Sequence, residues 1–321
     1  MKVFSHPPGE NWIVDRITQE FCSATTHDVV GLNDCDTIML FAPWVWRQYP
    51  AKFLQDKNFI LMLHHIVEDK FNIDDFKSRD IYVDQYVVPN EYTYNYVKKH
   101  TEKPIEQICY WINPQLWPSY QKDAARQELK KICLRNSDAI ATNVDLNIDL
   151  NNHIVVGSFQ RDTEGSDLRT PKYEKGPDLF IKSIKNVKNR ENLLVLLGGW
   201  RRQYIISQLE DLNIKYIYLE RPPLELINLM YDCLDLYIVS SRYEGGPQAI
   251  IECAYKKVPI ISNDVGIAKR ILEKKCVTPV ENTFFIPDEN QVDIAYENCL
   301  EVLLPKQIEK FDKLIQQNRE Q

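Results

Sequence analysis

The alternation of short apolar runs with stretches of helical periodicity constrains the fold of this chain most strongly. Strand-like runs occur at 1–6, 36–44, 58–66 and 84–89, and again at 152–159, 191–199, 214–219, 234–241 and 258–262. Amphipathic stretches of helical length separate most of them. Strands that alternate with helices indicate βαβ units and parallel sheets. The sequence therefore predicts an α/β protein.

The runs form two sets, which predicts two domains, because 321 residues exceed what one hydrophobic core usually organises. We expect an N-terminal domain over 1–118, a linker with a connecting helix over 119–150, and a C-terminal domain over 151–321. The last helix could pack back on the first domain. Ligands of open α/β sheets bind beyond the carboxyl ends of the strands. The predicted fold is thus two doubly wound Rossmann-like domains facing across a ligand cleft.

Composition and charge exclude several classes of function. A formal net charge of −7 argues against a nucleic-acid partner. No segment resembles a signal peptide, and no apolar run approaches the roughly 20 residues that span a bilayer, so membrane association is not indicated. The eight cysteines are scattered singly, without CxxC pairs, which favours reduced thiols over disulfides or zinc. We expect a soluble, cytoplasmic protein.

Residues 240–266, SSRYEGGPQAIIECAYKKVPIISNDVG, combine two glycines with a proline where a helix is predicted to begin. Pro247 suits the first helical position, since its missing N–H would be unpaired there. Gly245 and Gly246 allow a ligand to approach the backbone closely. Free N–H groups at a helix start bind anions, phosphate included.

Two glutamates flank this turn. Glu244 precedes the glycines, and Glu252 is expected about two turns into the helix, on the order of 12 Å along its axis. The simplest interpretation is that Glu244 complements the helix dipole and Glu252 is a solvated charge. However, Glu252 stands among Ile250, Ile251 and Ala254, where an idle carboxylate is costly. We therefore favour hydroxyl-binding roles on either side of a phosphate site.

The stretch 240–266 resembles the E-x7-E signature of family-four retaining glycosyltransferases of the GT-B fold. One departure is Cys253-Ala254, where Glu-Ala-Met is common. The resemblance implies a C-terminal domain that binds a nucleotide-sugar donor and an N-terminal domain on the acceptor side. It also implies that Glu244 orients the donor sugar and acts in catalysis, while Glu252 holds the ribose hydroxyls.

The segments VVGSFQRDTEG and PKYEKGPDLFIKSI resemble the first strand of the family's donor domain and the helix that follows. By this resemblance Gly157 contacts the donor, and Arg161 and Lys175 hold its diphosphate and assist catalysis. The spacing leaves open whether Lys175 or Lys172 makes the contact. A strand end followed by basic residues and a helix start is itself a plausible diphosphate clamp, although surface cations are the simpler alternative. The segment ending at Arg221 is expected near the nucleobase.

The N-terminal half offers weaker candidates. Related enzymes have a glycine-containing loop after the first strand, which suggests Gly9 for donor contact, with Glu10 and Asn11 as possible neighbours; a simple turn is the alternative. The family often carries a histidine at a strand end beside the donor sugar. Adjacent strand residues point to opposite faces, so only one of His64 and His65 is expected to face the ligand. We slightly favour His65 as the catalytic histidine and keep His64 as an acceptor contact.

Trp44, Trp46 and Tyr49 lie close together near another strand end. Aromatic rings stack on sugar faces, so Trp44 and Trp46 are possible acceptor contacts. Packing in the core is the more ordinary interpretation of such a group.

The expected activity is transfer of a hexose, with retention, from a donor of the GDP-mannose or UDP-glucose type to a hydroxyl of a glycan or other acceptor. No DxD-type acidic cluster is positioned to bind a metal diphosphate, so we expect no metal and no cofactor. A nucleotide-sugar epimerase and a non-catalytic scaffold on the same fold are the alternatives. A nicotinamide dehydrogenase would need GxGxxG after the first strand, and SHPPGENW lacks it.

Overall fold

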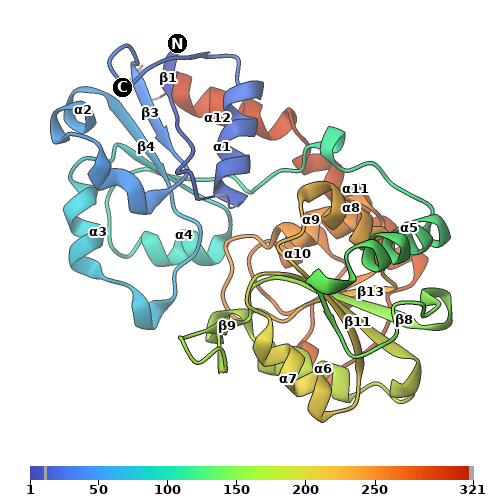
Figure 1. Cartoon of the computed structure of the whole chain (residues 1–321). Helices are drawn as coiled ribbons and strands as arrows, with labels where there is room; N and C mark the ends of the chain where they lie inside the picture. Colours follow the sequence, from blue (N-terminus) through green and yellow to red (C-terminus); the bar gives the residue numbers. More distant parts are fainter. Residues whose placement is uncertain (11–12, 318–321) are drawn as a thin grey trace. The chain divides into compact units, whose positions relative to one another are not determined.

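The structure, a computed structural model, describes residues 1–10 and 13–317 and divides into two compact units (Figure 1). The first unit comprises Met1–Asn113, Glu244–Gly246 and Glu301–Gln321. The second comprises Pro114–Tyr243 and Pro247–Leu300. Each unit has its own sheet with helices packed on it, which confirms the predicted class of two Rossmann-like α/β domains.

The first unit is built on a six-stranded parallel sheet with the order β2-β1-β3-β4-β5-β6. Its strands are β1 (Lys2–Phe4), β2 (Asp28–Val29), β3 (Thr37–Leu40), β4 (Asn58–Met62), β5 (Gln85–Val88) and β6 (Ile105–Gln107). Strands β3, β4 and β5 are buried on both faces except for Asn58, as expected for the centre of a parallel sheet.

The helices of the first unit are α1 (Ile13–Ala24), α2 (Ala51–Asp56), α3 (Ile73–Asp80), α4 (Glu91–Val97) and α12 (Lys306–Gln317). Although α12 lies near the end of the chain, it lies beside α1 and completes this unit (Figure 1). Phe311 of α12 packs on Phe21 and Phe41, with ring centroids 6.0 and 5.6 Å apart. Asp312, buried beside it, accepts a hydrogen bond from the amide of Thr26 at 2.9 Å.

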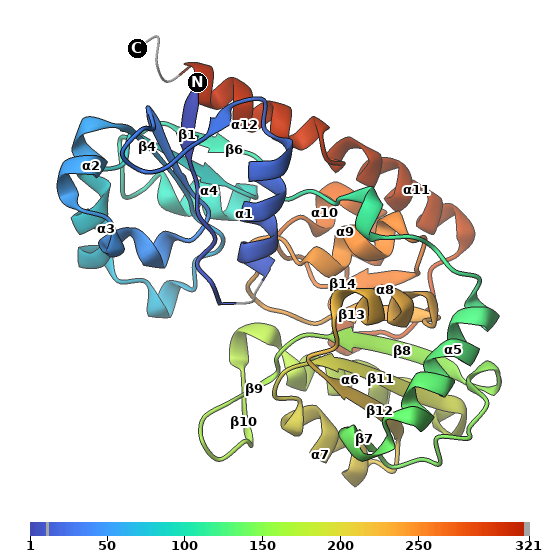
Figure 2. The ribbon, with the colours of Figure 1, turned by 45° about the horizontal axis from the view of Figure 1, so that its top comes forward.

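The second unit has a six-stranded sheet with the order β14-β13-β8-β11-β12-β7, parallel except for β7. Its strands are β7 (Ile140–Thr142), β8 (Ile154–Phe159), β11 (Leu193–Gly199), β12 (Lys215–Glu220), β13 (Leu236–Val239) and β14 (Ile260–Ser262). A separate hairpin of β9 (Thr163–Glu164) and β10 (Thr170–Pro171) extends from the end of β8 (Figure 2).

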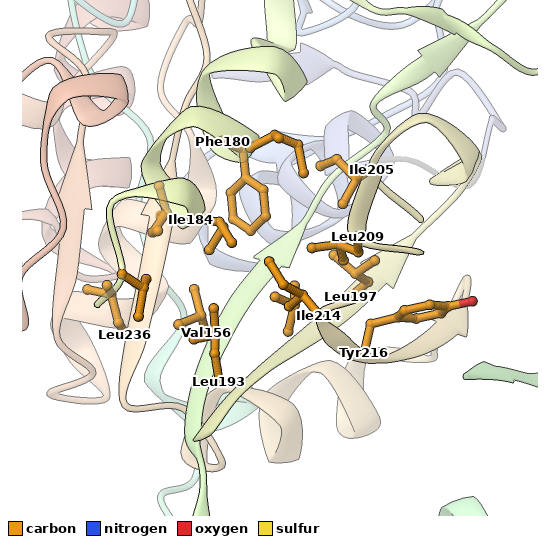
Figure 3. Packing of buried hydrophobic residues seen from close by; sticks show 14 of the residues in the cluster. Val156, Phe180, Ile184, Leu193, Leu197, Ile205, Leu209, Ile214, Tyr216 and Leu236 are labelled. Atoms are coloured by element: carbon orange, nitrogen blue, oxygen red, sulfur yellow. The ribbon is translucent and has the colours of Figure 1, made fainter. Parts of the chain in front are cut away.

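The helices of the second unit are α5 (Lys122–Arg135), α6 (Pro177–Lys185), α7 (Gln203–Asp211), α8 (Leu224–Asp232), α9 (Gln248–Tyr255), α10 (Ala268–Ile271) and α11 (Glu289–Cys299). One face of the sheet buries apolar side chains against α6 and α7 (Figure 3). Leu193, Val195 and Leu197 alternate along β11 toward this face, and Phe180 and Ile205 cover them from the helices. Because successive side chains of a strand point to opposite faces, every second residue of this continuous apolar run lines this face.

Residues 119–150, expected to hold a linker and a connecting helix, belong to the second unit. Helix α5 lies along α8 (Figure 2), and β7 forms the antiparallel edge of the sheet. Arg126 of α5 is buried, and its guanidinium donates to Asp235 at 2.6 Å and to the carbonyl of Cys233 at 3.0 Å. The connecting helix predicted in this segment is α5, whose buried side chains are Ala125, Arg126, Leu129 and Cys133.

Each sheet has one place where the strand order reverses, and such switch points are where open α/β sheets bind ligands. In the second unit it lies between β8 and β13, and in the first between β1 and β3. The loops after these four strands therefore define where a site is to be sought.

Candidate functional site

The loop after β8 gathers cationic side chains. Arg161 follows the strand by two residues, and Lys172 and Lys175 return to it after the β9–β10 hairpin. Burial lowers the pKa of Lys172; Glu174 opposes this shift, and the positive charges of Arg161 and Lys175 add to it. The three cations therefore lie within electrostatic reach of one another. The carboxylate of Glu164 also lies within this reach, and the group stands beside a switch point of the sheet.

Lys175 precedes the start of α6, and Gly176 fixes this turn. Gly176 has φ of +56°, and a Cβ there would overlap the carbonyl oxygen of Ser240 at the end of β13. The carbonyl of Lys175 accepts hydrogen bonds from Gln160 at 3.1 Å and from the Ser240 hydroxyl at 3.2 Å. The loops after β8 and β13 are thus joined through the backbone around Gly176.

Replacing Gly176 with alanine is expected to lower the free energy of unfolding by about 2 kcal/mol or more, because it adds both a clash and a strained backbone. Urea unfolding measures the loss. Gly165→Ala is the matched control. Gly165 has φ of +77°, but the atom nearest to an added Cβ, at 3.0 Å, belongs to the exposed side chain of Asp167. If Gly176→Ala cost no more than Gly165→Ala, the close approach to Ser240 would not be what selects glycine.

A buried ion pair holds the loop after β8 to the loop after β11. Asp162 and Arg202 are both 0% exposed and form an ion pair through Oδ2 and Nε. Arg202 also donates to the Gly198 carbonyl at 2.7 Å and to the Ser158 hydroxyl at 3.0 Å. The amide of Thr163 donates to the Arg201 carbonyl at 3.1 Å. The loop that carries Arg161 is therefore held in place by the contacts of the next two residues, Asp162 and Thr163.

Helix α9 begins one residue later than predicted, with Pro247 as its N-cap. Glu252 is its fifth residue, about 6 Å along the axis rather than two turns. Its side chain is buried, with the residue 6% exposed, and accepts a hydrogen bond from the Tyr231 hydroxyl at 2.8 Å. The neighbouring apolar residues predicted this burial, whereas a ribose-binding role for Glu252 stays a prediction.

In the first unit, His64 is held by both ring nitrogens at the end of β4. Nε2 lies 2.5 Å from the carbonyl of Phe41, which can only accept, so Nε2 carries the proton. Nδ1 then accepts from the Tyr110 hydroxyl, and the two rings stack with centroids 5.6 Å apart. Burial lowers the pKa of His64 to about 4, so the ring is neutral at physiological pH.

The segment Glu244–Gly246 packs on this group within the first unit. A Cβ on Gly245 would overlap the His64 carbonyl oxygen and lie 2.8 Å from the Tyr110 hydroxyl, so only glycine fits. Asn90, which is buried, donates to the Gly245 carbonyl at 2.5 Å. Burial raises the pKa of Tyr110 well above its usual value, and the negative charge of Glu244 raises it further. The Glu244 carboxylate therefore lies near Tyr110.

The state of His64 predicts a pH dependence of stability. In the unfolded chain the ring takes up a proton near pH 6.5, whereas in the folded chain it does so near pH 4. The contribution of His64 to the free energy of unfolding is complete above pH 6.5 and is lost as the pH falls from 6.5 to 4. In this range the free energy of unfolding falls by up to about 1.4 kcal/mol per pH unit. Urea unfolding across this range measures it. His64→Gln keeps a donor and an acceptor without titrating, so an unchanged pH slope in that variant would contradict this assignment.

The switch point of the first unit carries Gly9, Glu10 and Trp44. Gly9 has φ of +78°, with open space around its Cα, and its amide donates to Asp15 of α1 at 2.7 Å. Glu10 accepts from the Trp44 indole N–H at 2.9 Å. Trp44 is 46% exposed, and its ring centroid lies 6.2 Å from that of His64. Asn11 lies outside the described residues.

Three predicted site residues have surroundings that the sequence did not indicate. Gly157 lies inside β8, and a Cβ there would overlap Leu234. Trp46 is only 8% exposed and packs on Tyr82. The donor contact of Gly157 and the acceptor contact of Trp46 stay predictions. Of the two histidines, it is His64 that contacts the Glu244–Gly246 segment, while the side chain of His65 is exposed. Whether His65 contacts a ligand stays a prediction.

The structure also brings in residues that sequence reasoning missed. Trp200 and Arg201 follow β11 directly, and the guanidinium of Arg221, at the end of β12, lies 4.5 Å from the centre of the Trp200 ring. Asn90 and Tyr110 contact the Gly245 segment. The pair Gly198-Gly199 directly before Trp200 was a usable signal for a strand-end loop near a ligand.

A groove of about 760 Å³ in the second unit lies to one side of these groups. It is lined from the loops after β13 and β14, by Ser241, Arg242 and Asn263 among others. No predicted site residue lines it. In the part of the chain that is described, no helix is long and apolar enough to cross a bilayer. The same residues contain no cluster of three or more His, Cys, Asp or Glu suited to a metal ion.

Comparison with known proteins agrees with this arrangement. Residues 170–321 match the family "Glycosyl transferases group 1". No curated protein matches the sequence. HepE of Anabaena in complex with UDP-glucose has a TM-score of 0.64 at 11% identity, over 99% of both chains. A glycosyltransferase from Rickettsia africae gives 0.63 at 14% identity, over 99% of this chain and 98% of that one. Sucrose-phosphate synthase from Thermosynechococcus elongatus gives 0.62 at 14% identity, over 88% and 73%.

These structural likenesses, at such low identity, establish the fold, and the fold is GT-B. The family match covers the segment 170–321, which carries Lys175, Glu244 and Glu252.

Proposed function

We propose that the protein is a retaining glycosyltransferase that moves a hexose from a nucleotide diphosphate sugar, of the GDP-mannose or UDP-glucose type, to an acceptor hydroxyl. The observation that carries the proposal is the group of Arg161, Lys172 and Lys175 at the switch point between β8 and β13. HepE, which shares the fold, has been solved with UDP and with UDP-glucose, and this supports a nucleotide-sugar donor. The proposal includes a cytoplasmic location and a glycan or similar acceptor.

In the proposed reaction, the second unit would stabilise the leaving group. When the bond from the anomeric carbon to the β-phosphate oxygen breaks, both electrons go to the nucleoside diphosphate. The acceptor oxygen bonds to the anomeric carbon, and its hydroxyl proton would pass to the departing β-phosphate oxygen. Arg161 and Lys175 would stabilise the growing negative charge, with the backbone around Gly245, Gly246 and Pro247 as further donors. Since fixed cations supply this stabilisation, the proposal assigns no metal ion to the reaction.

In the proposed reaction, the first unit would recognise sugar hydroxyls. Glu244 would orient the donor sugar, and the neutral His64 beside it offers a fixed ring rather than a charge. His65 is retained as a candidate catalytic histidine, and Gly9 as a close approach for the donor. Trp44, exposed and anchored by Glu10, is proposed as the aromatic contact of the acceptor.

Calorimetric titration with UDP, GDP, ADP and their common sugar conjugates, in a chelator-containing buffer, tests the proposal. We expect one nucleotide to bind in the micromolar range and its affinity to fall in Glu252→Gln. Glutamine still accepts the hydrogen bond from Tyr231, so folding is maintained, and Tyr231→Phe controls for that contact. If no nucleotide bound the wild type, the non-catalytic scaffold would become the better interpretation. Conversion of the donor sugar to its epimer without transfer would instead favour the epimerase.

A further inference from the structure

The segment Glu244–Gly246 is assigned to the first unit, whereas every other residue from 114 to 300 belongs to the second. Its neighbours in the chain, Tyr243 and Pro247, are among those residues of the second unit. A loop keeps one conformation only where contacts offset the chain entropy that is lost by fixing it. The contacts that fix Glu244–Gly246 are therefore to be sought within the first unit.

Three adjacent strands of the first sheet, β4, β5 and β6, end around this segment. His64, Asn90 and Tyr110 follow these strands in turn. The His64 carbonyl and the Tyr110 hydroxyl lie so close to Gly245 that they exclude a side chain there, which is a steric limit. Asn90 adds a directional contact. Its Nδ2 donates to the Gly245 carbonyl at 2.5 Å and lies 3.5 Å from the Glu244 carbonyl oxygen.

Both ends of the Asn90 side chain have partners. Oδ1 accepts from the amide of Thr93 at 2.8 Å and so caps α4, while Nδ2 donates to Gly245. A flipped amide would set oxygen against oxygen and N–H against N–H, so the two partners fix its orientation. A helix cap needs only an acceptor, which serine or aspartate also supplies. The contact with Gly245 needs the amide donor as well, in a residue that is only 3% exposed.

We propose that Asn90 is a positioning residue for sugar transfer, because its hold on the Gly245 carbonyl sets where the Glu244 carboxylate stands. This inference rests on the proposed function, in which Glu244 orients the donor sugar. Asn90 acts through Glu244 and not on the substrate. The effect is expected to be large, since a reacting geometry displaced by about 1 Å can cost on the order of 10²-fold in rate.

Asn90→Asp tests this role while keeping the cap, because aspartate and asparagine cap helices about equally well. The new carboxylate has the shape of the amide but only accepts, so it opposes the Gly245 carbonyl. We expect kcat with the donor identified by titration to fall about 10- to 100-fold, with a smaller change in KM. The affinity for the nucleoside diphosphate alone should stay unchanged, because Arg161, Lys172 and Lys175 belong to the second unit.

A pH profile separates positioning from general damage. Protonation of the new carboxyl group restores a donor toward Gly245, and burial near the charge of Glu244 raises the pKa of such a group. The ratio of variant to wild-type kcat should therefore rise as the pH falls from about 8 to about 5.5. His64 stays neutral over this range, because its pKa is about 4. A ratio that did not change with pH would contradict the role of the donor.

Asn72→Asp is the matched control. Asn72 caps α3 in the same way, accepting from the Asp75 amide at 2.9 Å, but it is exposed. This variant should leave kcat unchanged. Asn90→Ser caps without a charge and is too short for the bond to Gly245, so it repeats the test if the carboxylate prevents folding.

The outcomes distinguish the inference from the proposed function. If Asn90→Asp transferred sugar like the wild type, Asn90 would serve only as a cap, and the inference would fail while the proposed function stood. An equal loss of nucleoside diphosphate affinity would assign the effect to the fold as a whole and would also overturn the inference. If the wild type neither bound a nucleotide nor transferred sugar, both would fail.

Discussion

Replacing Arg161 with glutamine is expected to lower kcat for sugar transfer by about 10²–10³-fold, the usual effect of removing one preorganised group that stabilises developing charge. Arg161 stands at the switch point of the second unit, and the Asp162–Arg202 pair fixes its loop. Because the departing nucleoside diphosphate gains negative charge in the transition state, the loss should fall on kcat more than on KM. Release of the nucleoside diphosphate from the donor identified by titration measures it.

Arg169→Gln provides the matched control for this variant. Arg169 also belongs to the segment between β8 and α6, but it is exposed beside Asp167 near the tip of the hairpin. Its removal takes away the same charge and should change kcat less than twofold or so, since exposed and distant charges are screened. Equal effects of the two variants would mean that the total charge of the loop, rather than the position of Arg161, assists the reaction.

Asp162→Ala is expected to lower the free energy of unfolding by about 3–5 kcal/mol, because it leaves a fully buried guanidinium without its counter-ion. Arg202 is 0% exposed, and its other partners are the neutral oxygens of Ser158 and Gly198. The midpoint and slope of urea unfolding give the loss. Glu128→Gln, which removes an exposed ion pair with Lys131 at 3.4 Å, should cost less than about 1 kcal/mol.

A paired substitution separates charge burial from packing in this result. Replacing both residues, as Asp162→Leu with Arg202→Met, removes the unpaired charge and should cost less than Asp162→Ala alone. If the double variant were the less stable one, the hydrogen bonds from Arg202 to the two strand ends would matter more than the ion pair. A loss below about 1 kcal/mol in Asp162→Ala would show that Arg202 finds solvent or another partner.

The sequence predicted most of the elements that form the two sheets, because strand burial leaves a direct trace in composition. The runs that became β8, β11 and β12 are continuous apolar segments, as buried parallel strands require. Short or polar elements escaped prediction. Strand β7 has three residues, none of them fully buried, so it presents no apolar pattern that differs from a linker.

The sequence indicated the residues of the candidate site that leave a local signal, and it could not indicate those that depend on contacts between distant segments. Gly245 stood out as one of two glycines before a proline, and the structure shows its backbone too close to His64 and Tyr110 for a side chain. The partners of His64 at Phe41 and Tyr110 are remote in sequence, so the sequence could not show that this ring is held by both nitrogens. A glycine required by packing, as Gly157 is against Leu234, looks the same in sequence as one required by a ligand.

The sequence by itself determined the alternation of strands and helices, and with it two parallel sheets whose polar strand-end loops carry the candidate site. Only the tertiary structure decided which of these loops meet. It placed α12 in the first unit, paired Asp162 with Arg202, and brought three arginines onto Trp200. The reason is that periodicity records whether a residue is buried, which is a local property, whereas strand order and side-chain partners depend on contacts between distant segments.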